Sequence, residues 1–68
     1  MPDDITKETN VAALIRHADG EREKHMHQLK LLLAAPCVPP GASWFDACED
    51  ELEAIARYKS DISILQTL

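Results

Sequence analysis

The segment PCVPPGA, residues 36–42, separates two parts of the chain that are patterned for helices. Pro36 lacks a backbone donor and clashes with the preceding turn, so a helix that reaches this residue ends there. The two further prolines and the glycine of the segment prevent an early restart. Ser43 then offers an N-cap hydroxyl, and Asp46 follows three residues later, as in a capping box. The sequence therefore predicts a turn at 36–42 with a helix on either side.

The part before the turn predicts a helix over 10–35. Asn10 is a suitable N-cap, and apolar residues then recur at spacings of three and four. The dipeptide Asp19-Gly20 falls in a polar gap, but a single glycine inside a helix costs only about 1 kcal/mol. One helix, bent or weak at Gly20, is favoured over two. Residues 1–9 have no periodic apolar pattern, and we expect them to be flexible.

The part after the turn predicts a second helix over 43–67, with acidic residues early and basic residues later, as the helix dipole favours. It carries two apolar stripes. The first is expected to face the other helix and consists of Phe45, Cys48, Leu52, Ile55, Ile62 and Leu65. The second is expected to stay bare and consists of Trp44, Ala47, Glu51, Ala54, Tyr58, Leu65 and Leu68.

The two predicted helices match in length, at roughly 37–39 Å each. A short turn between equal helices predicts an all-α antiparallel hairpin over residues 10–68. Folding at the turn brings Arg22 close to residues 58–61, where it is expected to form a salt bridge. Because two helices cannot cover both stripes, we expect a homodimer that forms a four-helix bundle. The predicted core or dimer contacts are Leu29, Leu32, Cys48, Leu52, Ile55, Ile62 and Leu65.

Length and charge exclude several classes of function. A chain of 68 residues has room for one domain, and its net charge of −5 does not fit a phosphate-binding surface for nucleic acid. The longest apolar run, residues 31–35, is far shorter than the ~18 residues of a membrane span. The N-terminal residues are acidic, unlike those of a secretory signal. We expect a cytoplasmic protein that binds neither membrane nor nucleic acid.

The residues capable of chemistry are few. His25, His27, Cys37 and Cys48 form the one set that suggests a metal site. However, two histidines separated by two residues point away from each other on a helix, and ligands on one face lie three or four apart. His17 has no serine or cysteine at a spacing that would suggest a nucleophile–base pair. A short helical chain also scarcely forms a substrate pocket. We expect no metal, no cofactor and no enzymatic activity, with the histidines exposed or facing a partner.

Aromatic and acidic residues at the start of the second helix are the better functional candidates. Trp44 and Phe45 lie one turn from a carboxylate run at 49–53, which is either a solvated helix face or a patch for a basic surface. Trp44 either belongs to the dimer core or contacts a partner, and Tyr58 shares these alternatives. The predicted partner-binding residues are Trp44, Phe45, Glu51 and Tyr58.

The layout of residues 10–68 resembles that of small phage-encoded anti-activators, which bind and inactivate a quorum-sensing regulator of the bacterial host. The shared features are a short acidic chain, two helices that make a dimer, and a tryptophan-bearing turn, here residues 39–45. The resemblance implies a cytoplasmic inhibitor that docks on a LuxR-type transcription factor. No sequence motif is shared that would assign a function to a particular residue. The predicted site residues therefore follow from residue type and position alone.

A second resemblance is to the helical-hairpin co-chaperones of type III secretion needle subunits. Residues 52–65 look like the second helix of those proteins. This resemblance implies a small helical adaptor that covers an aggregation-prone subunit together with another chaperone. The proline-rich turn and the adjacent Trp44-Phe45 pair depart from that pattern, which places this function second.

The cysteines supply a first test. If both thiols are free, neither a reducing agent nor a chelator should change the helical circular dichroism of the protein. Loss of helicity with the reducing agent would reveal a disulfide, and loss with the chelator would reveal a metal site.

Overall fold

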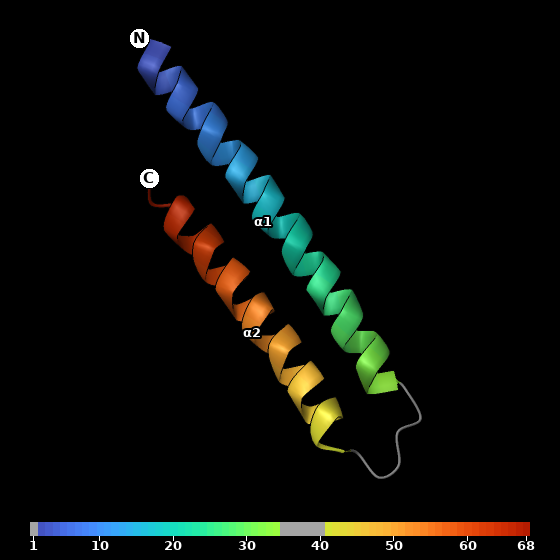
Figure 1. The fold of residues 1–68 in the computed structure, drawn as a ribbon. Coiled ribbons are helices and arrows are strands. Elements are labelled where there is room, and N and C mark those ends of the chain that lie inside the picture. The colour runs from blue at the N-terminus through green and yellow to red at the C-terminus, as the bar shows by residue number, and fades with distance from the viewer. Residues whose placement is uncertain (1, 35–40) are drawn as a thin grey trace.

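The computed structural model describes residues 2–34 and 41–68, with side chains from residue 5 onward. These residues form two helices, α1 (Pro2–Ala34) and α2 (Ala42–Leu65). The helices pack side by side in opposite directions, as Figure 1 shows. The predicted all-α antiparallel hairpin is therefore confirmed.

Helix α1 is longer than the sequence pattern predicts. It begins at Pro2 rather than after Asn10, so it includes residues that were expected to be flexible. Proline is favoured at the first helical position because its missing N–H has no partner there in any case. The aspartates that follow are a residue type favoured in a first turn. The start of α1 consequently extends past the end of α2 (Figure 1).

Helix α1 also runs without interruption through Gly20, in agreement with the one-helix prediction. It ends at Ala34, and residues 35–40, which hold most of the predicted turn and Cys37, lie outside the described part of the chain. The two helices lie on either side of this segment, as the prolines predict.

The start of α2 differs from the predicted capping box. Gly41 is the N-cap, and its carbonyl accepts hydrogen bonds from the backbone N–H groups of Trp44 at 3.0 Å and Phe45 at 3.1 Å. No side chain caps this end, and Ser43 lies inside the first turn. The helix starts one residue early because Ala42, a good helix former, already adopts helical geometry. Its other end stops at Leu65, two residues before the predicted end.

The contact between the helices, called the seam below, combines most of both predicted stripes and leaves out Phe45, Leu52 and Leu68. Phe45 and Leu52 were expected to face α1, yet their exposed fractions are 52% and 53%. Seam residues are at least half-buried in the hairpin. On α1 they are Val11, Ile15, Ala18, Arg22, His25, Leu29 and Leu32, and on α2 Trp44, Ala47, Cys48, Glu51, Ala54, Ile55, Tyr58, Ile62 and Leu65.

Two physical causes explain this rotation of α2. Ala18, Ala47 and Ala54 are small, so they let the helix backbones approach each other. The seam of α1 also contains His25, a polar side chain that needs a polar partner when it is half-buried. Turning Glu51 toward α1 provides that partner, whereas the stripe of Phe45 and Leu52 does not.

The hairpin has almost no interior. Among the described residues only Ala18 and Cys48 are buried, with exposed fractions of 4% and 7%. The Cα atoms span 59 × 14 × 13 Å, and their radius of gyration of 16.4 Å exceeds the roughly 11 Å of a compact chain of this length. The molecule is a rod whose stability depends on a single line of contacts.

The continuity of α1 at Gly20 yields a stability prediction. A Cβ added at Gly20 meets nothing within 4 Å, so Gly20→Ala should raise the free energy of unfolding by about 0.5–1 kcal/mol. Urea unfolding followed by circular dichroism, at one fixed chain concentration, measures the change.

Gly41→Ala is the matched control, because it adds the same methyl group at a position that is also open. Gly41 is an N-cap, where alanine is less favourable than glycine, so this variant should not gain stability. A loss of stability in Gly20→Ala would contradict a continuous helix.

Candidate functional site

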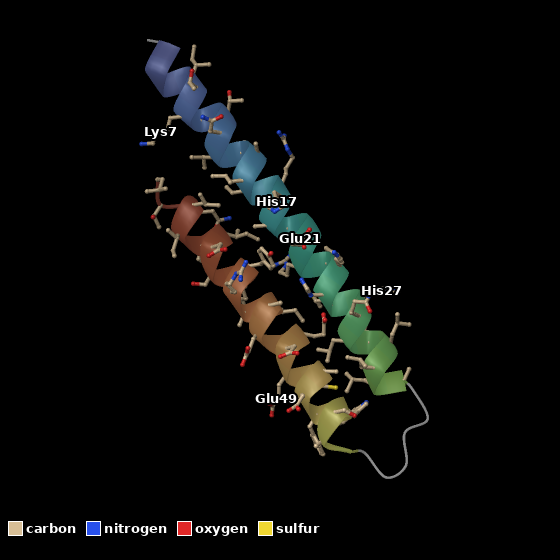
Figure 2. The ribbon with its side chains drawn as sticks, in the orientation of Figure 1. Lys7, His17, Glu21, His27 and Glu49 are labelled. Atoms are coloured by element: carbon tan, nitrogen blue, oxygen red, sulfur yellow. The ribbon has the colours of Figure 1, made fainter. Side chains whose placement is uncertain are left out.

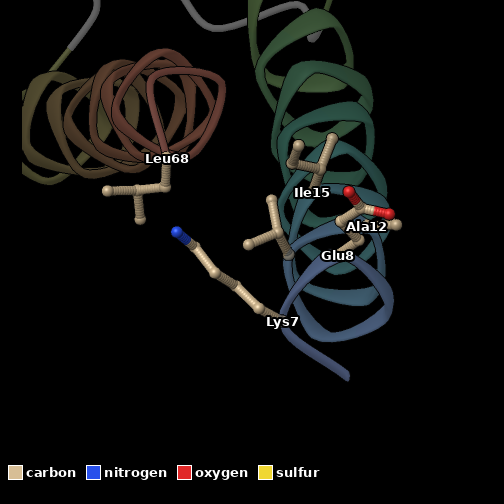
Figure 3. A pocket seen from close by; sticks show the side chains of 6 residues that line it. Lys7, Glu8, Ala12, Ile15 and Leu68 are labelled. Carbon is tan, nitrogen blue, oxygen red and sulfur yellow. The ribbon is translucent and has the colours of Figure 1, made fainter. Parts of the chain in front are cut away.

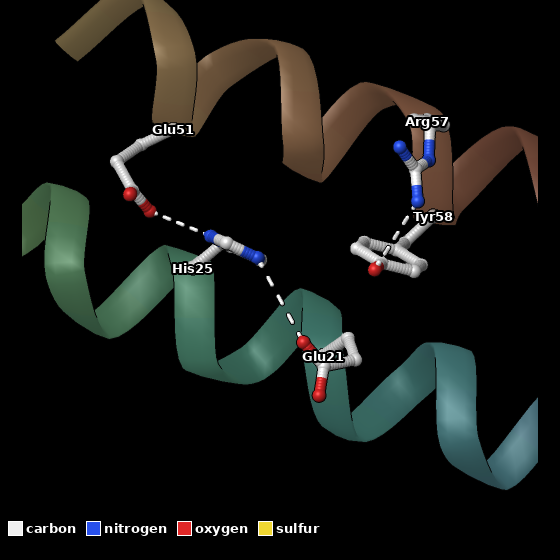
Figure 4. Close-up of polar contacts among 5 residues, drawn as sticks. All are labelled: Glu21, His25, Glu51, Arg57 and Tyr58. Carbon is white, nitrogen blue, oxygen red and sulfur yellow. Dashed lines mark hydrogen bonds and ion pairs between the residues drawn. The ribbon is translucent and has the colours of Figure 1, made fainter. Parts of the chain in front are cut away.

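A polar cluster occupies the middle of the seam (Figure 4). The Nδ1 atom of His25 lies 2.8 Å from Oε2 of Glu51, and Nε2 lies 3.9 Å from Oε2 of Glu21. The short contact joins α1 to α2, with the ring N–H donating to the carboxylate. His25 was expected to be exposed or to face a partner, but it is half-buried and serves the hairpin itself.

Tyr58 extends this cluster along α2. Its ring stacks on the His25 ring, with the centroids 5.9 Å apart and the planes 16° from parallel. The guanidinium carbon of Arg57 lies 5.0 Å from the Tyr58 ring centroid. Arg57 also donates a long hydrogen bond of 3.4 Å to the Tyr58 hydroxyl. The structure thus brings Glu51 and Tyr58, both predicted to bind a partner, together on His25.

Trp44 closes the seam at the turn end. Its indole Nε1–H donates a hydrogen bond of 3.0 Å to the backbone carbonyl of Leu32. Leu32 is in the last turn of α1, where carbonyls have no partner within the helix. Trp44, in the first turn of α2, therefore provides a hydrogen-bond donor for a carbonyl at the end of α1. This is a structural role for the residue.

Phe45 differs from its neighbour. It makes an edge-to-face contact with the Trp44 ring at a centroid distance of 5.3 Å, and half of its surface remains exposed. Of the four residues predicted to bind a partner, Phe45 is thus the one that the hairpin leaves most accessible. The other three are half-buried in the seam.

The predicted core residues divide between the seam and the surface. Cys48 is buried and carries a free thiol. Leu52 is exposed, so within a single chain it belongs to no core. The remaining predicted core residues are half-buried in the seam: Leu29, Leu32, Ile55, Ile62 and Leu65.

Arg22 does not form the predicted salt bridge to α2. Its guanidinium pairs within α1, at 2.6 Å from Asp19 and 3.7 Å from Glu23. The link between the helices that sequence reasoning missed is the one from His25 to Glu51. Its signal was present, because His25 has the heptad position of the seam residues Ala18 and Leu32 on α1.

The two sides of the rod that flank the seam differ in character. Leu14 of α1 and Ile64 of α2 line one hollow of about 280 Å³, together with His17, Tyr58 and Asp61. These flanks therefore lie on the same side of the hairpin. Three exposed carboxylates of α2, Asp46, Asp50 and Glu53, have heptad positions on this side, and the half-buried Asp61 borders its hollow. We call this surface the acidic side, and its carboxylates are Asp46, Asp50, Glu53 and Asp61.

A second hollow lies between the start of α1 and the end of α2. Its volume is about 370 Å³, and Lys7, Val11, Ile15 and Leu68 are among its lining residues. Figure 3 shows the amine end of Lys7 reaching across the gap between the helices toward Leu68. From this hollow toward its N-terminus, α1 extends beyond α2 and has no helix of the described chain packed against it (Figure 1).

The described residues provide no metal site, because no group of three or more histidine, cysteine or acidic side chains comes together in them. His27 and Glu49 point away from the seam on opposite edges of the hairpin (Figure 2). Neither of the two helices has a stretch long and apolar enough to cross a lipid bilayer.

The geometry of Trp44 yields the next prediction. Trp44→Phe keeps an aromatic ring but loses the indole donor, so it should lower the free energy of unfolding by about 1 kcal/mol. Tyr58→Phe is the matched control, because the hydroxyl it removes makes only a long, exposed hydrogen bond. Its effect should stay within about 0.5 kcal/mol in urea unfolding at the same chain concentration. Equal effects of both variants would contradict a capping role for Trp44.

Comparison with known proteins assigns no family to this chain. No protein-family model, curated protein or solved structure matches it. Its function is therefore argued from the surfaces described above.

Proposed function

We propose that the chain is a non-enzymatic inhibitor that acts by binding another protein. The observation that carries this proposal is the large apolar surface that the hairpin leaves uncovered, because exposed apolar patches on a small protein mark interaction sites. The exposed large apolar residues are Ile5, Leu14, Met26, Leu31, Leu33, Phe45, Leu52, Ile64 and Leu68.

The polar groups of the seam support a non-enzymatic role. His25, Glu51 and Tyr58 contact one another across the two helices, and their partners are used by the fold. The two exposed hollows, both in the half of the seam away from the turn, are lined mostly by apolar side chains. Recognition of another surface suits such a lining better than chemistry on a small substrate.

The acidic side indicates the nature of the partner. Asp61 borders the apolar hollow of Leu14 and Ile64, and Asp50 and Glu53 lie on the same side of α2. This combination complements a surface that offers an apolar anchor surrounded by basic residues. Proteins that bind DNA carry such basic surfaces.

More specifically, we propose that the chain is a phage-encoded cytoplasmic anti-activator that binds a LuxR-type transcriptional regulator of the host. The acidic side would cover the basic DNA-binding surface of the regulator and compete with DNA for it. This specific form rests on the resemblance in layout, and the acidic side supports it.

A second candidate function is that of a co-chaperone of a type III secretion needle subunit. Leu52 and Ile64, within the segment that resembles such proteins, are exposed on α2. An apolar subunit that wraps around α2 would cover both. Co-expression that keeps a needle subunit soluble would favour this candidate over the inhibitor.

A reporter assay tests the inhibitor. A bacterial strain carries a promoter driven by a LuxR-type regulator, and the chain is expressed in it. The chain should lower reporter output, and purified chain should bind the purified regulator at micromolar concentration. Glu53→Lys should weaken binding about tenfold or more, and added salt should weaken binding of the unaltered chain.

Glu8→Lys is the matched control, because it changes net charge equally at an exposed position on α1, away from the acidic side. It should bind like the unaltered chain. Full reporter output together with no complex at 100 µM would overturn the specific form of the proposal.

A further inference from the structure

The hairpin exposes more surface than a compact protein of its mass. Its accessible area is 5263 Å², whereas a compact chain of 7.6 kDa exposes about 4,300 Å². The excess of about 1,000 Å² is close to the ~800 Å² per partner that a standard interface buries. The chain therefore has enough uncovered surface for one stable interface along its length.

On each helix, one row of residues at alternating spacings of three and four, the spacing of knobs-into-holes packing, alternates between the edge of the seam and the surface just outside it. On α2 the row is Phe45, Cys48, Leu52, Ile55, Lys59 and Ile62. On α1 the row is Ile15, Asp19, Arg22, Met26, Leu29 and Leu33. In the half of each row nearer the turn, the members outside the seam are apolar and exposed: Met26, Leu33, Phe45 and Leu52.

Both rows lie on the same side of the hairpin. Leu14 and Ile64 line one hollow, which places their flanks of α1 and α2 together on the acidic side. Met26 and Leu52 are on the opposite flanks of their helices. They consequently share the other side of the rod, which we call the apolar side and define by the two rows.

Most charges of the chain lie off the apolar side, and Glu49, which neighbours Phe45 and Leu52 on α2, is the carboxylate nearest to its exposed part among the described residues of that helix. Asp19 and Arg22, the charged pair within the α1 row, already neutralise each other at 2.6 Å. The carboxylates of Asp46, Asp50 and Glu53 lie roughly 100–160° around α2 from Leu52, at 100° per residue. Two chains of charge −5 can therefore meet at their apolar sides with these carboxylates turned away from each other.

We propose that a second copy of this chain packs on the apolar side across a two-fold axis, so that two hairpins form a four-helix bundle. A two-fold interface uses the same patch on both chains, which a surface made of two parallel rows on a straight rod permits. A chain in which Ala18 and Cys48 are the only buried residues of the described part needs a further layer to be stable. A second copy supplies that layer wherever the chain is made.

This assignment changes part of what the sequence predicts, because Cys48, Ile55 and Ile62 face α1 as expected whereas two members of the same stripe do not. The stripe of Trp44 and Tyr58, which was expected to pair with another chain, is occupied by α1. Phe45 and Leu52, which were expected to face α1, become part of the dimer interface instead. The proposal stands independently of the identity of any other protein partner, because it uses the side opposite the acidic one.

Sedimentation equilibrium on paired variants tests the interface. The unaltered chain at micromolar concentration should sediment at twice its mass of 7.6 kDa. Leu52→Glu should raise the dimer dissociation constant about 100-fold or more. Ile64→Glu is the matched control, because Ile64 is as exposed as Leu52, at 57% against 53%, but lies on the acidic side. It should change the dissociation constant less than about threefold.

A measurement without substitutions covers the case in which Leu52→Glu does not fold. A one-to-one mixture of isotope-labelled and unlabelled chains should show intermolecular NOEs from the Phe45 ring and the Leu52 methyl groups. A monomeric unaltered chain at 100 µM would overturn the proposal, as would dissociation caused by Ile64→Glu rather than Leu52→Glu. Partner binding is read separately, since Ile64→Glu should impair it without dissociating the dimer.

Discussion

Two helices touch along one line, and in this chain that line cannot hold all the apolar side chains that the helices carry. The seam takes Trp44 and Tyr58 from α2 and leaves Phe45 and Leu52 outside. The same constraint explains the thin interior, the excess of accessible surface and the difference between the two sides of the rod. The apolar side is the surface that this constraint leaves uncovered, and it is the surface that we propose a second copy covers.

The polar cluster in the seam fixes how the helices meet. Apolar side chains at regular spacing allow two helices to slide past each other by a heptad, because one leucine or isoleucine packs much like another. The contact of 2.8 Å between His25 and Glu51 allows only one alignment, since a slide would leave both groups half-buried without a partner. Trp44 reinforces the same alignment from the turn end, because its indole reaches the carbonyl of Leu32. The cluster thus contributes specificity where the apolar contacts contribute stability.

Much of the fold was predictable from the sequence, because proline geometry and apolar spacing act locally. The break after Ala34, the continuity through Gly20 and the antiparallel pairing all follow from such local rules. The start of α1 at Pro2 was missed, since residues 2–9 have no apolar period and their helical structure continues from the helix that follows. The orientation of α2 was missed for a different reason. It depends on which of two stripes satisfies His25 on α1, and hydrophobicity alone ranks the stripe with Leu52 above the stripe with Glu51. Of the predicted site residues, three are used within the hairpin, and Phe45 remains accessible.

The separation of the two sides makes self-association compatible with binding another protein. When two chains meet at their apolar sides, their acidic sides face outward and are related by the two-fold axis. Because the two acidic sides face opposite directions, a two-fold symmetric partner engages both at once only if it reaches around the bundle, and the second contact then forms at a high effective concentration. The individual contact between one acidic side and the partner can consequently be weak. A hollow of about 280 Å³ bordered by a few carboxylates is suited to such a weak individual contact. On this reasoning, loss of the dimer should weaken partner binding even when the acidic side is intact, because the two contacts become independent.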